Sequence, residues 1–190
     1  MIPKIQANVV NSYDETTISS DEFENNFTAK GNATFQSSNE AILTNDIASQ
    51  VGYIVFNDKI NMNYDFKFAG QIYLGKRDGA DGVSFILHPN DQNIISKDGD
   101  QIGISGIPNA VGFKLDIYFN GDVDPVIFKN KSFGAFLTTD ATGETSSSIN
   151  AQQIDDPDET FKEITIKYNA QSQQLTINYE NKTFIEKISM

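Results

Sequence analysis

The sequence contains no cysteine, and that absence removes several kinds of chemistry at once. The chain can have no disulfide, no zinc site built on thiolates and no thiol nucleophile. Histidine is almost as scarce, since His88 is the only one. With one histidine and no serine placed beside a base, nucleophilic acyl transfer lacks its parts. The lack of cysteine does not fix the compartment, because many extracellular proteins also have none.

Positively charged residues are also few. The chain carries 14 Lys and Arg residues against 26 Asp and Glu residues, which gives a formal net charge of −12. A field of that sign repels phosphate backbones and anionic lipid headgroups, so we expect neither nucleic acid nor a membrane surface as a partner. An acidic excess is compatible with cation binding, although most surface carboxylates are only solvated.

Long hydrophobic runs are missing as well. No apolar run approaches the ~20 residues of a transmembrane helix, and the opening MIPKIQANVVNSYDE contains no signal-peptide core. The last residues, TFIEKISM, stop directly after a strand-like run, as in a domain excised from a longer protein. We therefore expect any signal or anchor to lie outside this chain.

Aromatic residues, in contrast, are plentiful. They make up 11% of the chain, and 14 of them are Phe. A chain of 190 residues with this much apolar surface can bury a substantial core. We expect one domain over residues 1–190, with residues 1–25 as a loose lead-in.

Sheet-type alternation runs through most of the chain. Apolar and polar residues alternate in 64–74, 163–168 and 174–179, and turn-forming residues bound nearly every segment. The more uniformly apolar GVSFILHP (82–89) predicts a buried central strand. One helical turn is expected near residues 19–27. Many short strands with almost no helix predict an all-β fold, an antiparallel β-sandwich.

The stretch VGFKLDIYFNGDVDP (111–125) combines a strand pattern with an unusual polar face. One parity is apolar, and the other carries Lys114, Asp116, Tyr118 and Asn120. Residues two apart on a strand point the same way and lie about 6.5–7 Å apart, so the last three would share one face. A turn through Gly121 would bring Asp122 and Asp124 back toward that face.

This set of oxygen atoms suits a hard cation. Calcium takes 6–8 oxygen ligands at about 2.3–2.6 Å and tolerates irregular geometry. Protein ligands and water would fill such a site, the protein ligands being Asp116, the Tyr118 carbonyl, the Asn120 side chain and Asp124. The same residues also fit a polar sheet rim followed by a turn, because Asp- and Asn-rich turns are common.

The second informative stretch is DGADGVSFILHP (78–89). Asp81 directly precedes a strand that is too apolar to face solvent. An Asp in this position is often only a turn former. Alternatively, its carboxylate is fixed at the mouth of a sheet and accepts hydrogen bonds from vicinal hydroxyls of a ligand.

Taken together, these segments resemble the L-type lectins, and most of all the lectin modules of bacterial surface adhesins. The similarity covers most of the chain: residues 27–56 resemble the opening strands, 78–89 the sugar-binding Asp segment, 111–125 the metal loop and 161–184 the closing hairpin. The two middle motifs are fairly specific in this combination and order. The resemblance implies a concanavalin A-like jelly roll.

The resemblance also implies a calcium site. One Ca²⁺ would be held by four residues: Asp116, Tyr118 through its carbonyl, Asn120 and Asp124. The spacing in this loop differs among members of the family, so Asp122 is a rival to Asp124.

A sugar site is implied beside the calcium. Asp81 would bind sugar hydroxyls after a cis Ala80–Asp81 peptide, and Asn120 would donate its amide N–H. The Tyr118 ring would stack on the apolar side of a pyranose. The Gly106 backbone N–H would complete the hydrogen-bond set, and the loop 141–150 would set the sugar specificity.

One departure from the family concerns a second metal. Plant members hold a transition-metal ion with a Glu two residues before the shared Asp and with a downstream His. Here the first position is Lys114, and no His follows Pro125, so no manganese site is expected. We hypothesise that the Lys114 ammonium takes the vacated space and neutralises Asp116 or Asp124. The alternative is an ordinary exposed lysine.

The same departure bears on catalysis. Sandwiches of this kind also occur in glycoside hydrolases, so the fold does not decide. Retaining glycosidases need two carboxyl groups about 5–5.5 Å apart, and the matching strand positions, 114, 116 and 118, carry one. We therefore expect no enzyme.

The expected function is that of a calcium-dependent carbohydrate-binding module, the ligand-binding region of a bacterial surface adhesin, with glycans or glycoproteins as partners. A calcium-rigidified structural or protein-binding module is the alternative. The expected location is the cell surface, as part of a larger anchored protein. No feature of the sequence selects a particular sugar or oligomeric state.

Overall fold

The computed structural model describes residues 4–11, 16–77, 79, 81–96 and 100–188. Strands predominate, and the helices are short: η1 (Ser20–Glu22), α1 (Phe23–Asn26), η2 (Asp100–Gly103) and η3 (Val126–Phe128). Among the described residues, no helix is long and apolar enough to cross a membrane. The chain divides into two compact units.

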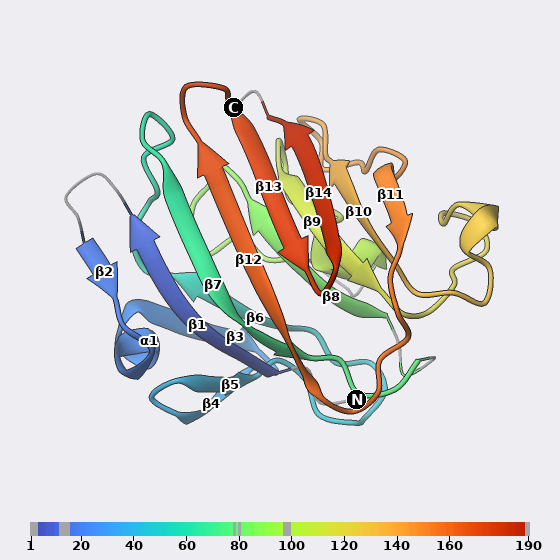
Figure 1. Cartoon of the computed structure of the whole chain (residues 1–190), viewed down its shortest axis with the longest axis horizontal. Coiled ribbons are helices and arrows are strands. Elements are labelled where there is room, and N and C mark those ends of the chain that lie inside the picture. Colours follow the sequence, from blue (N-terminus) through green and yellow to red (C-terminus); the bar gives the residue numbers. More distant parts are fainter. Residues whose placement is uncertain (1–3, 12–15, 78, 80, 97–99, 189–190) are drawn as a thin grey trace. The chain divides into compact units, whose positions relative to one another are not determined.

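The first unit comprises Asp46–Val51 and Leu74–Thr160. It contains an antiparallel four-stranded sheet in the order β11-β10-β9-β8 (Figure 1). Its strands are β8 (Gly82–Leu87), β9 (Val111–Asp116), β10 (Phe133–Thr138) and β11 (Ile149–Gln153).

Strand β9 is the most enclosed strand of this sheet, because all of its residues are buried. It pairs with β8 on one side and with β10 on the other, so Asp116 lies opposite both Gly82 and Phe133. The side chain of Lys114 is 1% exposed. The polar parity of β9 is therefore not a solvent face.

Strand β8 differs from its prediction as a central strand. It is the last strand in the order, and only its residues Val83 and Leu87 are buried while the others are half-buried. A loop covers its apolar residues instead: Ile86 packs against the buried Ile104 and Ile107. Ser84 Oγ also donates to the Ile102 carbonyl, at 2.6 Å. The apolar residues of GVSFILHP are thus explained by a loop that packs on β8. They do not indicate a strand paired on each side of it.

The second unit comprises Ile2–Asn45, Gly52–Tyr73 and Phe161–Met190. It contains an antiparallel eight-stranded sheet in the order β14-β13-β12-β7-β1-β5-β4, with β2 paired to β1 (Figure 1). The strands of this sheet are β1 (Lys4–Asn11), β2 (Thr16–Ile18), β4 (Thr34–Ser37), β5 (Glu40–Ile42), β7 (Phe66–Tyr73), β12 (Phe161–Asn169), β13 (Gln174–Tyr179) and β14 (Lys182–Lys187). A two-stranded sheet is formed by β3 (Phe27–Gly31) and β6 (Gly52–Phe56).

Alternation in the large sheet matches the sequence pattern. In β12, Ile164, Ile166 and Tyr168 are buried, whereas Lys167 and Asn169 are exposed. Strand β13 alternates in the same way, with the odd-numbered residues buried. The predicted strands at 64–74, 163–168 and 174–179 are confirmed. The face opposite the buried residues is called the outer face of this sheet.

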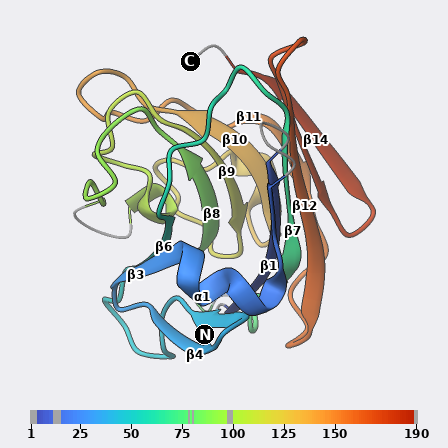
Figure 2. The same ribbon diagram turned by 90° about the vertical axis from the view of Figure 1, so that its left-hand side faces the viewer.

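The start of the chain departs from the expected loose lead-in. Strand β1 pairs with β7 along its whole length, from Lys4 opposite Tyr73 to Asn11 opposite Phe66. Strand pairing is made by backbone groups, so the weak side-chain alternation of KIQANVVN did not reveal it. The predicted helical turn is confirmed by η1 and α1, and Figure 2 shows α1 beside β3.

Candidate functional site

A buried lysine and two buried carboxylates meet at the end of β9. Lys114 Nζ lies 2.8 Å from Asp116 Oδ2 and 2.8 Å from Asp124 Oδ1. The side chains of Lys114, Asp116 and Asp124 are 1%, 2% and 0% exposed. These three residues are called the Lys114 centre. The hypothesis that Lys114 pairs with Asp116 or Asp124 is confirmed for both, and the exposed-lysine alternative is wrong.

The surroundings hold the ammonium group in place. Lys114 and Asp116 are two residues apart on β9, so their side chains leave the strand on the same side. Lys114 Nζ also lies 3.5 Å from Gln101 Oε1 and 4.9 Å from the centroid of the Phe133 ring. A buried charge is stable only with partners of this kind. Two carboxylates and one ammonium leave the centre one formal negative charge.

The remaining negative charge is costly for Asp116. Burial raises the pKa of Asp116 to about 6, and Lys114 opposes that rise through its charge and its hydrogen bond. The neighbouring Asp124 carboxylate raises the pKa of Asp116 further. An ionised carboxylate in this environment is stabilised by any additional positive charge nearby.

The second oxygen of each carboxylate faces the loop after β9. Asp116 Oδ1 accepts a hydrogen bond from the Tyr118 N–H at 3.2 Å, and Asp124 Oδ2 accepts one from the Asn120 N–H at 2.7 Å. The Asn120 carbonyl in turn accepts from the N–H groups of Val123 and Asp124. These bonds fold residues 118–124 into a turn around the two carboxylates.

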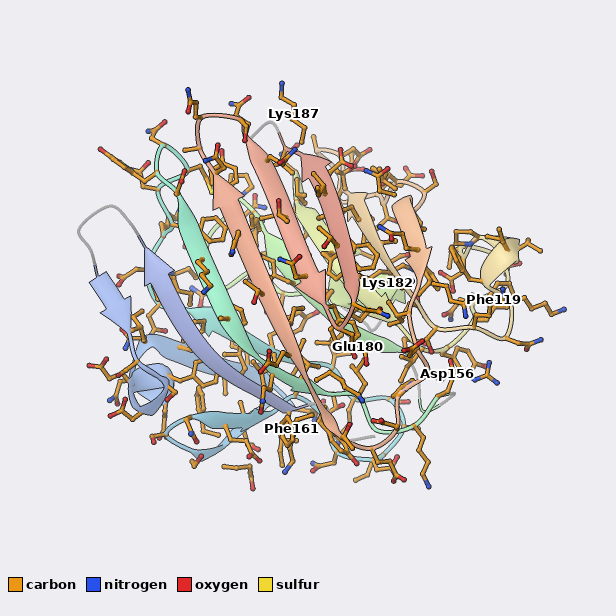
Figure 3. The ribbon with its side chains drawn as sticks, in the orientation of Figure 1. Phe119, Asp156, Phe161, Glu180, Lys182 and Lys187 are labelled. Carbon is orange, nitrogen blue, oxygen red and sulfur yellow. The ribbon has the colours of Figure 1, made fainter. Side chains whose placement is uncertain are left out.

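That turn replaces the extended strand that the sequence pattern predicts. Strand β9 ends at Asp116, so Tyr118 and Asn120 meet Asp116 through the turn and not through the pleat. Tyr118 is 43% exposed, and Figure 3 labels its neighbour Phe119 in this loop. Asp122 is exposed and makes no hydrogen bond or ion pair within the described residues. The structure thus brings Asp124, not its rival, to Lys114.

Asp81 lies next to the end of β9 through its backbone. The Ile117 N–H donates to the Asp81 carbonyl at 2.9 Å, one step beyond the pairing of Gly82 with Asp116. Gly82 has φ +148°, and a Cβ there would lie 2.0 Å from the Leu115 carbonyl oxygen, so only glycine fits. The predicted cis peptide involves Ala80, which lies outside the described residues.

Gly106 is engaged by the loop that was predicted to set specificity. Its N–H donates to the Gly143 carbonyl at 2.9 Å. Gly143 has φ +87°, and a Cβ on it would lie 2.7 Å from Gly106 Cα. The Asn109 N–H also donates to the Asp140 carbonyl, at 2.8 Å. The backbone N–H that was expected to reach a sugar therefore joins two loops in this structure.

Asp140 organises the second of these loops. Its Oδ1 accepts from Thr142 Oγ1 and from the Thr142 N–H, both at 2.7 Å, and from the Glu144 N–H at 3.0 Å. These hydrogen bonds, with that of the Thr142 side chain the largest influence, hold the pKa of Asp140 below its usual value. The sequence prediction treated 141–150 only as a variable loop. An Asp two residues before a Thr, a common turn pattern, was the signal for Asp140.

The Lys114 centre and the turn after it offer oxygen donors of the kind that calcium binds. Among the described residues, no three His, Cys, Asp or Glu side chains gather as metal ligands. The centre has two carboxylates, and the turn adds the Tyr118 carbonyl and the Asn120 side chain, all oxygen donors of the kind that calcium prefers. Lys114 Nζ already gives Asp116 Oδ2 and Asp124 Oδ1 a cationic partner.

Comparison with known sequences identifies relatives over nearly the whole chain. A family model described as the legume lectin beta-barrel domain, of L-type lectins, matches residues 18–190. A serine-rich adhesin for platelets from Staphylococcus aureus is 32% identical over 197 residues, which cover 91% of this chain and 9% of the adhesin. The adhesin of that name from strain MRSA252 is 34% identical, again over 91% of this chain and 15% of its own length. The chain therefore spans a small part of these relatives.

Solved structures with the same fold are plant lectins. A structure of peanut lectin with a 9mer peptide has a TM-score of 0.65 at 18% identity, covering 97% of this chain and 82% of the lectin. The lectin UEA-II, complexed with galactose, has a TM-score of 0.61 at 16% identity, covering 87% and 78%. These similarities confirm the predicted all-β, jelly-roll-like sandwich.

Proposed function

Because the chain belongs to the L-type lectin family, as a lectin-like module similar to part of bacterial adhesins, we propose that it binds glycans with the help of one calcium ion. The lectin and adhesin relatives indicate a binding module rather than an enzyme. Calcium dependence, the site residues and the single-domain organisation of residues 1–190 are part of the proposal.

The observation that carries the proposal is the meeting of two motifs that are far apart in the sequence. Asp81 and Asp116 lie at the ends of β8 and β9, where the Ile117 N–H still joins the two strands. The turn after Asp116 adds the exposed Tyr118 and the half-buried Asn120 beside these strand ends. Carboxylate oxygens, the Asn120 amide and the Tyr118 ring thus lie at one end of two neighbouring strands of one sheet.

Each of these residues has a proposed role. Asp116, Asp124, the Tyr118 carbonyl and the Asn120 side-chain oxygen hold the ion. Calcium, when bound, supplies positive charge to the two carboxylates and fixes the Asn120 side chain. The Asn120 N–H and the Asp81 carboxylate then hydrogen-bond sugar hydroxyls, and the Tyr118 ring packs on the apolar side of the pyranose.

Gly106 and Lys114 act indirectly in this proposal. The Gly106 N–H, bonded to Gly143, holds two loops together, and Asp140 fixes the loop that adjusts to the sugar. Lys114 supplies, as a covalent part of the chain, the positive charge that a second metal would bring. A manganese ion is therefore neither needed nor accommodated.

The setting of the module follows from its relatives. Two of them are named as adhesins for platelets, so a place on a cell surface and a glycan or glycoprotein partner are proposed for this chain. A shallow site built from hydroxyl contacts binds each glycan weakly, and adhesion would gain strength from many copies acting together.

A glycan array with and without calcium tests this function. We expect specific glycans to be retained in calcium and lost after chelation, and lost also in Asp81→Ala with the fold intact. Asp58→Ala, an exposed carboxylate in the other unit, is the matched control and should bind as the wild type does. Calcium-dependent binding that persists in Asp81→Ala would refute the site.

The same experiment distinguishes the alternative functions. If calcium raises the unfolding temperature but no glycan is retained, the ion serves a structural or protein-binding module. If a retained glycan is cleaved, the module is a hydrolase. Cleavage is not expected, because strand positions 114, 116 and 118 carry one carboxylate where a retaining glycosidase needs two.

A further inference from the structure

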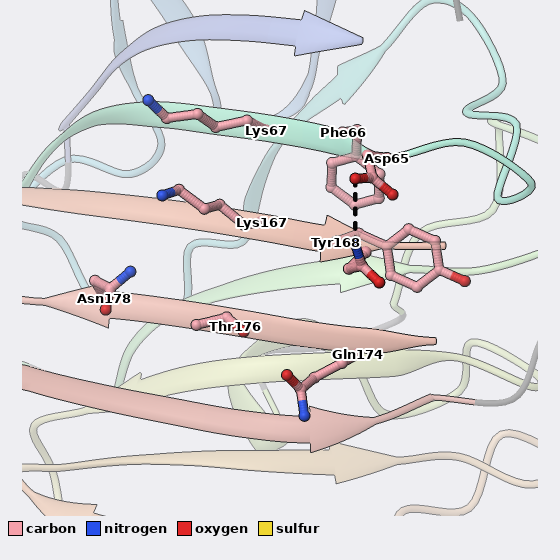
Figure 4. A pocket seen from close by; sticks show the side chains of 9 residues that line it. Asp65, Phe66, Lys67, Lys167, Tyr168, Gln174, Thr176 and Asn178 are labelled. Atoms are coloured by element: carbon pink, nitrogen blue, oxygen red, sulfur yellow. Dashed lines mark hydrogen bonds between the residues drawn. The ribbon is translucent and has the colours of Figure 1, made fainter. Parts of the chain in front are cut away.

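A groove lined by both apolar and polar side chains crosses the outer face of the eight-stranded sheet. It has a volume of about 400 Å³ and spans β7, β12 and β13 (Figure 4). Its polar side chains include Lys67 from β7, Lys167 from β12, and Gln174, Thr176 and Asn178 from β13. All of these residues belong to the second unit, whereas the Lys114 centre belongs to the first.

Two lysines face each other across this groove. Lys67 and Lys167 are directly paired in the register of β7 with β12, and both are exposed. Directly opposed residues of an antiparallel pair have Cβ atoms about 4.5–5.5 Å apart, and like charges in that position are destabilising. Neither lysine makes an ion pair or a side-chain hydrogen bond within the part of the chain that the structure describes.

Uncharged donors lie next to the two ammonium groups. Thr176 is paired with Lys167 in the register of β12 with β13, and Gln174 and Asn178 are two residues to either side of it. The Asn178 side-chain oxygen already accepts from Thr183 Oγ1, at 2.9 Å. No hydrogen bond of the Thr176 hydroxyl or the Gln174 amide occurs within the described residues. The groove therefore presents positive charge together with hydrogen-bond donors.

A third lysine extends the positive surface. Lys187 on β14 is paired with Gln174, so its side chain leaves the sheet on the same outer face, and Figure 3 labels it. The three lysines lie on β7, β12 and β14, with β13 between the last two. Neighbouring strands lie about 4.8 Å apart, so all three belong to one region of this face.

The single acidic residue among those that line the groove is engaged elsewhere. Asp65 Oδ1 accepts from the Ala170 N–H at 2.7 Å, and Asp65 Oδ2 accepts from Asn169 Nδ2 at 3.3 Å. These bonds tie its carboxylate to the end of the β12–β13 hairpin. This single carboxylate can offset only one of the two ammonium charges of Lys67 and Lys167, so the lining keeps a net positive charge.

General charge balance does not explain this arrangement. A protein with a net charge of −12 gains from any lysine on its surface. Two lysines placed apart would reduce that charge as well as two that face each other, without the repulsion between them. A facing pair with nearby donors is what recognition of an anion requires.

We propose that this groove, named here the Lys67–Lys167 groove, binds the anionic groups of an acidic polysaccharide, as sulfate esters or carboxylates. An ammonium group interacts with such an anion as a point charge, and the neighbouring amides and hydroxyl complete the hydrogen bonds. A two-fold contact of two copies centred on this groove would bring the lysines of both copies together, which repulsion disfavours.

Binding of defined polysaccharides tests the proposal. Dextran sulfate, carboxymethyl dextran and uncharged dextran are titrated against the full chain in calcium-free buffer, where the proposed calcium-dependent lectin site is inactive. We expect one or both charged polymers to bind and uncharged dextran not to bind. The charged polymer that binds more tightly identifies the anionic group. Affinity should fall between about 0.01 M and about 0.15 M salt, as the Debye length shortens from about 30 Å to about 8 Å.

A matched pair of double variants locates the binding. Lys67→Gln with Lys167→Gln should weaken binding of the charged polymer about tenfold or more, because charge-assisted hydrogen bonds are lost. Lys129→Gln with Lys131→Gln removes the same charge from exposed lysines in the first unit and should change the affinity less than twofold. Thermal unfolding confirms that both variants are folded.

Two results would overturn the proposal. Equal losses in the two double variants would show a non-specific response to net charge. Loss of polymer binding in Asp81→Ala would place the anion at the proposed sugar site instead. Because the titration needs no calcium, its failure leaves the lectin proposal intact, and failure of the glycan array leaves this one intact.

Discussion

The molecule contains lysines in two opposite situations. In the first unit, Lys114 is fully buried and bonds to two carboxylates at 2.8 Å each. In the second unit, Lys67 and Lys167 are exposed, face each other, and pair with no acid in the part of the chain that the structure describes. The chain has 26 acidic residues to distribute, so the difference does not reflect a shortage of carboxylates.

The contrast shows how the surroundings of a lysine indicate its role. A buried ammonium that satisfies two carboxylates has no capacity left for a ligand, and its removal leaves unpaired buried charge. An exposed pair that repels itself contributes little to stability and keeps its full capacity for an anion. We therefore assign a structural role to Lys114 and a ligand-binding role to the exposed pair.

The largest effect is expected for Lys114→Met. Two buried carboxylates would face each other without a counter-charge, and we expect the free energy of unfolding to fall by about 3–5 kcal/mol in urea denaturation without calcium. Calcium should restore part of the loss, because the ion supplies positive charge. Lys131→Met, at an exposed position, is the control. A loss in Lys114→Met no larger than that of the control would remove the distinction between the two kinds of lysine.

The next effect separates the two candidate aspartates. Asp124→Asn removes one charge-assisted bond to Lys114, for which we expect a loss of about 1.5–3 kcal/mol and much weaker calcium binding. Asp122→Asn, at an exposed position, should leave stability and calcium affinity nearly unchanged. Isothermal titration with calcium and urea denaturation of both variants provide the test. A larger calcium defect in Asp122→Asn would reverse the ligand assignment.

A smaller contrast concerns the two loops that are joined by Gly106 and Gly143. Gly143→Ala introduces a Cβ 2.7 Å from Gly106 Cα at φ +87°, whereas Gly106→Ala, at φ +82°, meets open space. Both substitutions carry about 1–2 kcal/mol of backbone strain, and Gly143→Ala adds a clash that must separate the loops. We expect it to be the more destabilising in thermal unfolding. Equal effects would mean that the loop contact does not matter.

The smallest stability effect is expected in the exposed pair. Lys67→Gln and Lys167→Gln should each change the free energy of unfolding by less than about 0.5 kcal/mol, with a slight gain if repulsion is relieved. Urea denaturation at low salt measures the change most sensitively, because salt screens exposed charges. A loss above 1 kcal/mol in either variant, on the scale of a lost hydrogen bond, would assign these lysines a structural role.

The sequence predicted the chemistry of the candidate site better than its backbone. The pairing of Lys114 with Asp116 or Asp124 was predicted because Lys114 stands where the similar lectins have a metal-binding Glu; Lys114 and Asp116 also share one strand parity. The turn at 118–124 was not predicted, since the apolar alternation continued to Phe119 while the strand ended at Asp116. The alternation of apolar residues predicts which side chains are buried, not where strand pairing ends. Ile117 is still buried although β9 ends at Asp116.

Other misses have the same physical origin. The apolar residues of β8 were attributed to neighbouring strands, although a loop containing Ile104 covers them. The facing of Lys67 and Lys167 depends on the register of two strands about 100 residues apart in the sequence (67 and 167), which a local pattern does not contain. Local sequence patterns thus predicted most of the strands. Which side chains meet on the surface of a sheet depends on the pairing of distant strands, which these patterns do not contain.

Metal stoichiometry tests the central claim most directly. The wild-type chain is dialysed to equilibrium against calcium and manganese together, and the ions bound per chain are counted by elemental analysis. If Lys114 takes the place of a second metal, each chain retains one divalent ion, and chelation removes it together with glycan binding. Two ions per chain, or none, would contradict this account of the Lys114 centre.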